Sequence, residues 1–179
     1  CVKTYPKKIH FLSKIKHFLD VHSRKMFFHA FIESHVNYVS TLWDSASENV
    51  LKPLLSLHRR ALKIIILKSS SLTVADYAGL DILPLKWKLK YNKAVFMFKI
   101  MSGCAPSAIT NNFLINEKRH VHKVMLPLPR VDILKSSLTY SGGSLWNHIS
   151  TSVNIHTSLN TFKRNYHSLL MKEYSDTIT

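Results

Sequence analysis

The feature that most constrains the fold is a hydrophobic seam within residues 26–68, a stretch that reads as two helices joined by a polar turn. In the second helix the seam residues recur every three or four positions, which is the spacing of one face of an α-helix. They are Leu51, Leu54, Leu55, His58, Leu62 and Ile65. Lys52, Arg59 and Lys63 each follow a seam residue by one position, about 100° around the helix. The pattern predicts a helix that packs inward along the seam and carries positive charge on its flank.

The same periodicity predicts a mostly α-helical bundle with a small β-hairpin or short strands near residues 124–140. A helix is expected to open near Pro6, another after Ser23 as its N-cap, and a long one to run from Pro84 to Met101. Further segments complete the expected fold: a short helix over 74–78 capped by Thr73 and closed by Gly79, edge strands at 126–130 and 136–140, and a final helix from Ser158. Residues 1–103 form the expected helical region, and residues 104–179 a C-terminal extension packed with it.

Positive charge strongly exceeds negative charge in this chain, and this excess limits the kinds of molecule that it is expected to bind. Lys and Arg number 25 against 10 Asp and Glu, a formal net charge of +15 among 46% hydrophobic residues. A field of this sign favours polyanions, nucleic acid first and an anionic membrane surface second. No apolar run reaches the roughly 18 to 20 residues of a membrane span, so no membrane partner is expected. Two cysteines do not make a disulfide framework, and the start at Cys1 indicates a piece of a longer protein.

Catalytic and metal-binding patterns are not apparent in the sequence. The acidic residues are scattered, without the clustered carboxylates that two-metal nucleases and polymerases require. The eleven histidines include the pair His120 and His122, but no Glu-backed i,i+4 pair and no thiolate completes a ligand set. Ser141-Gly-Gly-Ser144 matches neither a nucleophile elbow nor a phosphate loop. We therefore expect no catalytic residues, no metal, no cofactor and no small-molecule substrate.

Rows of basic residues on predicted helix faces, here called basic stripes, are the basis for the expected function. Lys7 with Lys14, Arg59 with Lys63, and Lys86 with Lys90 and Lys93 each share a face of a predicted helix. Stacked stripes of this kind can follow a nucleic-acid backbone, whereas a single lysine stripe is more often only a solvated face. Trp43, Trp87 and Trp146 are expected in the core or at its edge. The candidate nucleic-acid-binding residues are Lys52, Arg59, Arg60, Lys63, Lys86, Lys90 and Lys93.

An ordered series of short motifs runs through residues 23–170. It comprises Phe28, Phe31-Ile32, His35, Tyr38 and Trp43; Leu54, Leu57 and His58–Ile65; Leu80, Leu83-Pro84-Leu85; Lys93-Ala94, Met97–Ile100, Gly103 and Ala105-Pro106; Ser137, Tyr140, Gly142 and Leu145–Asn147; and Ser158-Leu159 with Phe162-Lys163. The series resembles the region beyond the catalytic core of reverse transcriptases from jockey-like non-LTR retrotransposons. The chain departs from that pattern with His58 in place of a Gln and His148-Ile149 in place of Leu-Pro.

The resemblance implies the thumb and C-terminal part of an RNA-directed DNA polymerase whose catalytic aspartates lie upstream. The partners that the resemblance implies are the RNA/DNA backbone of a template–primer duplex and the upstream polymerase core. It also implies that Arg59, Arg60 and Lys63 contact phosphates. The resemblance also implies an intracellular location for the protein, which would be the nucleus if the parent element is active. Two other interpretations stay open: a purely structural helical packing module without independent activity, and an independent enzyme.

Overall fold

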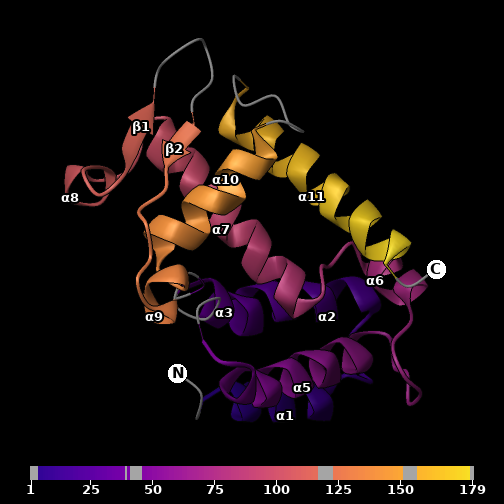
Figure 1. Ribbon diagram of the computed structural model, residues 1–179. Helices are drawn as coiled ribbons and strands as arrows, with labels where there is room; N and C mark the ends of the chain where they lie inside the picture. The colour runs from indigo at the N-terminus through magenta and orange to yellow at the C-terminus, as the bar shows by residue number, and fades with distance from the viewer. Residues whose placement is uncertain (1–3, 39, 41–45, 117–122, 151–156, 178–179) are drawn as a thin grey trace. The chain divides into compact units, whose positions relative to one another are not determined.

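The structure is a computed structural model that describes residues 4–38, 40, 46–116, 123–150 and 157–177 (Figure 1). It is mostly α-helical, as expected from the sequence. Two compact units divide the chain: residues 1–89 with 174–179, and residues 90–173. The division falls inside one helix near residue 89, not after Gly103 where the sequence placed it. Trp43, His120 and His122 lie outside the described residues.

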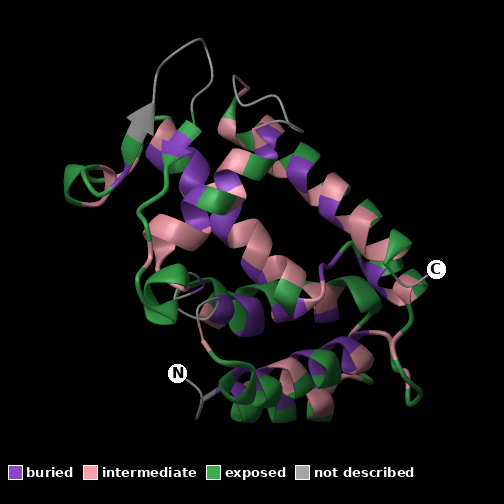
Figure 2. Cartoon of the chain, viewed as in Figure 1, coloured by how far each residue is buried: buried purple, intermediate pink, exposed green. Residues whose placement is uncertain are grey.

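The first unit contains most of the longer helices of the N-terminal half. They are α1 (Thr4–Ile15), α2 (Val21–Phe27), the π-helical η1 (Phe28–Glu33), α3 (Ser34–Tyr38), α5 (Glu48–Ile65), α6 (Val74–Leu80) and the first turn of α7 (Leu85–Met101). Most of the α5 seam is buried as predicted, with Leu51, Leu54, His58, Leu62 and Ile65 all in the core, whereas Leu55 is only partly buried. Buried residues of α1, η1 and α3 complete that core, and Figure 2 shows buried segments along these helices.

Only one apolar face of the helical segment after Asp20 is buried. Phe28, Ile32 and Val36 are fully buried, whereas Met26 and Phe31 are 60% and 50% exposed. The run Phe28–Glu33 forms a π-helix, whose wider turn shifts the helical phase. Because both faces of this segment are rich in phenylalanine and isoleucine, periodicity alone could not choose between them.

Two predicted helix ends are corrected by the structure. The N-cap of α2 is Asp20, whose carboxylate accepts a hydrogen bond from the Ser23 amide, so Ser23 is not the cap itself. Helix α6 continues through Gly79 to Leu80 and ends at Asp81, which adopts a left-handed conformation with φ of 52°. The Ile82 amide then bonds the Tyr77 carbonyl, which completes a Schellman-type end.

The second unit is built around aromatic residues of three helices: α7, α10 (Gly143–Ile149) and α11 (Leu159–Asp176). The ring of Phe162 stacks on Phe98 with centroids 4.5 Å apart and on Tyr166 at 5.7 Å, and Trp146 closes the cluster. All four side chains are buried. Trp146 is therefore a core residue, as the sequence predicted.

A two-stranded antiparallel hairpin lies in the second unit, between shorter helices. It pairs β1 (Leu114–Asn116) with β2 (Lys123–Met125), with Ile115 opposite Val124. The remaining elements are α8 (Ser107–Thr110), α9 (Asp132–Lys135) and the π-helical η3 (Leu138–Gly142). The expected strands at 126–130 and 136–140 are wrong, because the first segment is extended but unpaired and the second leads into η3. Two prolines deprive the first segment of ladder donors.

Candidate nucleic-acid interface

The flank of α5 forms one wall of an open groove in the first unit. Four of the seven candidate residues, Lys52, Arg59, Arg60 and Lys63, line the same groove. Its volume is about 570 Å³. The opposite wall is supplied by residues after the helix and by an aromatic pair: Ser71, Leu72, Tyr77 and Tyr174. The structure therefore brings cations separated by eleven positions in sequence onto one continuous surface.

Each wall of the groove is held in place by a feature of its local sequence. The seam residues Leu51, Leu54 and Leu62 anchor the inner face of α5 in the core, which leaves the flanking cations facing outward. Across the groove, Tyr77 is positioned by α6, whose first turn is fastened by Asp76. The Asp76 carboxylate accepts hydrogen bonds from the Thr73 amide at 2.6 Å and from the Lys68 ammonium at 2.5 Å. These bonds hold the pKa of Asp76 near 2, with Lys68 as the largest cause.

Arg59 is the cation most closely tied to the groove's aromatic wall. Burial raises the pKa of the Tyr77 hydroxyl, as does the neighbouring Tyr174, while the charge of Arg59 and its hydrogen bond to Tyr77 oppose the rise. Arg59 and Arg60 are both exposed, and Lys63 is half-buried. The guanidinium thus lies beside a phenol and remains open to solvent, a suitable arrangement for binding phosphate.

The three lysines predicted on α7 are placed differently. Lys86 is exposed and forms an ion pair with Glu48 at 2.6 Å, with both side chains more than half exposed. Lys90 pairs with Glu173 at 3.1 Å. Lys93 is only 8% exposed and donates a hydrogen bond to Ser141 Oγ at 3.2 Å. The predicted α7 stripe therefore does not form a row of solvent-facing cations, because its last lysine faces the interior of the second unit.

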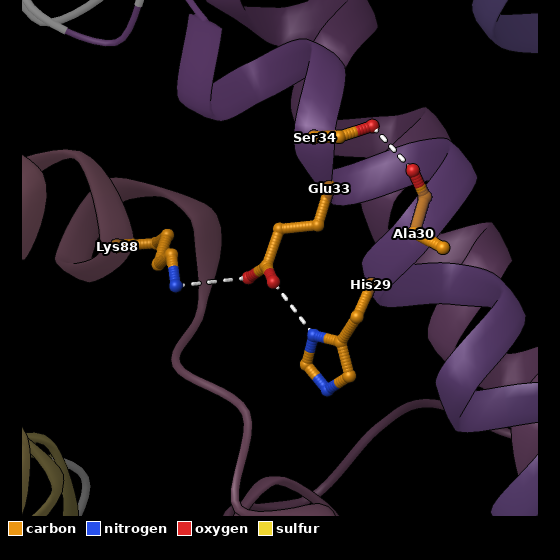
Figure 3. Close-up of polar contacts among 5 residues, drawn as sticks. All are labelled: His29, Ala30, Glu33, Ser34 and Lys88. Carbon is orange, nitrogen blue, oxygen red and sulfur yellow. Dashed lines mark hydrogen bonds and ion pairs between the residues drawn. The ribbon is translucent and has the colours of Figure 1, made fainter.

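A second polar cluster lies inside the first unit, as Figure 3 shows. The buried Glu33 carboxylate is 2.6 Å from His29 Nδ1 and 3.1 Å from Lys88 Nζ. Burial opposes ionisation of Glu33, but the His29 hydrogen bond and the Lys88 charge outweigh it and lower the pKa to about 2. An ionised carboxylate with two cationic or hydrogen-bonding partners supports the fold and is not poised as a general base.

The chain was compared with protein-family models, curated proteins and solved structures. None of the three comparisons returned a match. Across the described residues, no helix is long and apolar enough to cross a membrane. Within the same residues, no three histidine, cysteine or acidic side chains gather closely enough to hold a metal ion. The site must therefore be interpreted from its own geometry.

The aromatic wall is the part of the site that sequence reasoning missed. Tyr77 lies on a seven-residue helix and Tyr174 close to the C-terminus, so nothing in their spacing connects them to α5. Their rings are in edge-to-face contact with centroids 5.5 Å apart. The available signal was compositional: both are tyrosines, which combine an apolar ring with a polar tip and are frequent at binding surfaces.

Proposed function

We propose that this chain binds the sugar–phosphate backbone of nucleic acid through the groove beside α5, without sequence specificity and without catalysing a reaction. The supporting observation is that Lys52, Arg59, Arg60 and Lys63 line one open groove. From Lys52 to Lys63 the helix advances roughly 16 Å, which is close to five base-pair steps of a duplex. Cations spread over that length match a row of phosphates better than they match a single small anion.

The preferred ligand is an RNA–DNA or other duplex, held by contacts to phosphate that position the strand but do not read bases. In this proposal the chain derives from the thumb and C-terminal part of a non-LTR retrotransposon reverse transcriptase, and the upstream polymerase core supplies the chemistry. The motif series in the sequence supports that parentage. Coding sequence upstream of Cys1 tests it: a hairpin motif with adjacent aspartates is expected there, and an unrelated domain would refute the parentage.

The binding proposal is tested by titrating the full chain with a labelled heteroduplex at several salt concentrations. Affinity should fall steeply as salt rises, because each neutralised phosphate releases counterions. Replacing Arg59 and Lys63 with alanine should weaken binding. The same replacement should reduce the slope of log K against log salt by about one unit for each phosphate that these side chains no longer neutralise. Unchanged affinity in this double variant would refute the groove as the interface.

A matched control is available in the second unit. Lys99→Ala combined with Arg164→Ala removes the same charge from two exposed positions outside the groove. If the groove binds nucleic acid, this control should lose far less affinity than the α5 variant. Equal losses would show that binding depends only on net charge.

A purely structural packing module is the second candidate. The placement of the α7 lysines favours it, since Lys86 and Lys90 pair with acids and Lys93 is buried. For such a module we expect weak binding that is insensitive to salt and does not depend on the α5 cations. The salt titration therefore separates the two candidates directly.

A further inference from the structure

A smaller and more enclosed cavity of about 160 Å³ lies beside the α5 groove, within the first unit. Aromatic side chains and two cations form its lining, together with apolar residues around Pro84. The residues that matter here are His58, Arg59, Tyr77, Lys86, Trp87 and Tyr174. Drug-sized ligands occupy pockets of about 300 to 1,000 Å³. A cavity of this size is therefore suited to one planar ring system.

The aromatic walls of this cavity have defined geometry. The Trp87 and Tyr174 rings meet edge to face with centroids 6.0 Å apart and planes inclined at 64°. Tyr174 in turn meets Tyr77 at 5.5 Å and 80°. Both Trp87 and Tyr174 are only partly buried, so they border the cavity and also reach the surface. Rings fixed in this way provide apolar faces for stacking at little cost in side-chain entropy.

The cavity and the groove are adjacent because they share part of their lining. Leu55, Arg59, Tyr77 and Tyr174 border both. Arg59 therefore stands where the two meet, with further groove cations on one side and the indole of Trp87 on the other. A ligand with an anionic chain and a pendant aromatic ring would satisfy both surfaces simultaneously.

We propose that the cavity receives one unpaired base of a bound strand while the α5 cations hold the neighbouring phosphates. This inference rests on the proposed function and specifies its ligand: nucleic acid with a single-stranded or extruded nucleotide. A base that stacks on an aromatic side chain gains affinity without sequence readout, because every base has a π-face. The charge and the aromatic lining together match a nucleotide better than an apolar peptide, which would offer no phosphate to Arg59.

The test compares a single-stranded oligonucleotide with an abasic strand of equal length and charge, using the full chain at fixed salt. The base-containing strand should bind about ten-fold more tightly, the effect expected for stacking of one base. Trp87→Leu should abolish this preference and leave affinity for the abasic strand unchanged. Trp87→Phe keeps an aromatic face and should retain most of the preference.

The outcomes separate the inference from the function on which it rests. Equal affinity of the unmodified chain for the two strands would overturn the base-binding cavity and leave backbone binding intact. Failure to bind either strand, with salt-dependent binding of the heteroduplex retained, would overturn the base-binding cavity alone, whereas failure to bind the heteroduplex as well would overturn both. Thermal unfolding of each variant checks that it folds, and Tyr174→Leu provides a second route to the same cavity wall if Trp87→Leu does not fold. Retention of the full preference in a folded Trp87→Leu variant would also refute the proposal.

Discussion

Lys88 Nζ lies 3.1 Å from Glu33 Oε1, which ties the first turn of α7 to the π-helical segment η1 within the first unit (Figure 3). Both side chains are largely buried, at 16% and 7% exposure. His29 approaches the other carboxylate oxygen at 2.6 Å. An ion pair withdrawn from water in this way is costly to break, because the remaining charge is left without its partner.

Glu33→Gln or Lys88→Met should each reduce the free energy of unfolding by about 3 kcal/mol, since each leaves one buried group uncompensated. The double variant should lose clearly less than the sum, because it removes both charges together. Urea denaturation of the four proteins measures this coupling. Glu173→Gln provides the control: its pair with Lys90 is more than a third exposed, and it should lose less than about 1 kcal/mol. Additive losses at Glu33 and Lys88 would contradict the buried pair.

The buried imidazole of His58 should make stability depend on pH. Burial is the largest cause of its pKa falling from 6.5 to about 4, with Lys88 and Arg59 adding to the fall and Glu33 opposing it. Between pH 6.5 and 4 the unfolded chain therefore binds a proton that the folded chain excludes. Stability should fall by up to about 3 kcal/mol as pH drops through this window.

His58→Gln removes the titrating group and should flatten that pH dependence, as measured by thermal unfolding between pH 7 and pH 4. The carboxylate of Glu33 does not obscure the comparison, because its stabilising effect is lost at lower pH, between 4.5 and about 2. An identical pH profile in the His58→Gln variant would assign the dependence to other groups.

Two glycines should respond to alanine in opposite directions. A Cβ at Gly143 would stand 2.8 Å from Leu126 Cδ2 and 3.0 Å from Val124 Cγ1, so Gly143→Ala should cost about 1 to 3 kcal/mol. A Cβ at Gly79, inside α6, would meet no described atom within 4 Å. Gly79→Ala should therefore stabilise the chain by about 0.5 to 1 kcal/mol. Calorimetric melting temperatures that move in the same direction for both variants would contradict this contrast.

The side chain of Asn147 should be essential to the hairpin. Its amide oxygen accepts from the Val124 amide at 2.8 Å, and its amide nitrogen donates to the Val124 carbonyl at 2.9 Å. Asn147→Ala should cost about 2 kcal/mol, because two backbone groups of β2 lose their partner. Hydrogen exchange at the Val124 amide should also accelerate. Asn160→Ala, at an exposed position of α11, should change neither measurement.

Local chemistry in the sequence predicted much of the helical framework. Thr73 and Asp76 cap α6, Pro84 precedes α7, and the α5 seam is buried, because capping groups and periodicity act over a few residues. The hairpin was misplaced since its strands are three residues long, too short to show alternation. The burial of a side chain depends on distant segments that pack against it, which helical periodicity does not reveal. Lys93 was therefore expected at the surface, although the structure buries it.

The candidate site was predictable only in part for the same reason. Arg59 and Lys63 follow seam positions on one helix, so their common face is a local property of α5. Their opposite wall depends on Tyr77 and Tyr174, nearly a hundred residues apart, and on the fold that brings them together. The cavity beside Trp87 likewise arises from separate helices and has no signature in any one of them.

The π-helical turn at Phe28–Glu33 holds one residue more than regular α-helical turns would over the same rise. Deleting one residue inside this turn should restore an ordinary helix and keep Val36 directed into the core. Deleting one residue elsewhere in α2 or α3 would rotate everything beyond it by about 100° and expose Val36. Homologous chains should therefore vary in length at this turn, with a single-residue gap tolerated there and excluded from the flanking helices.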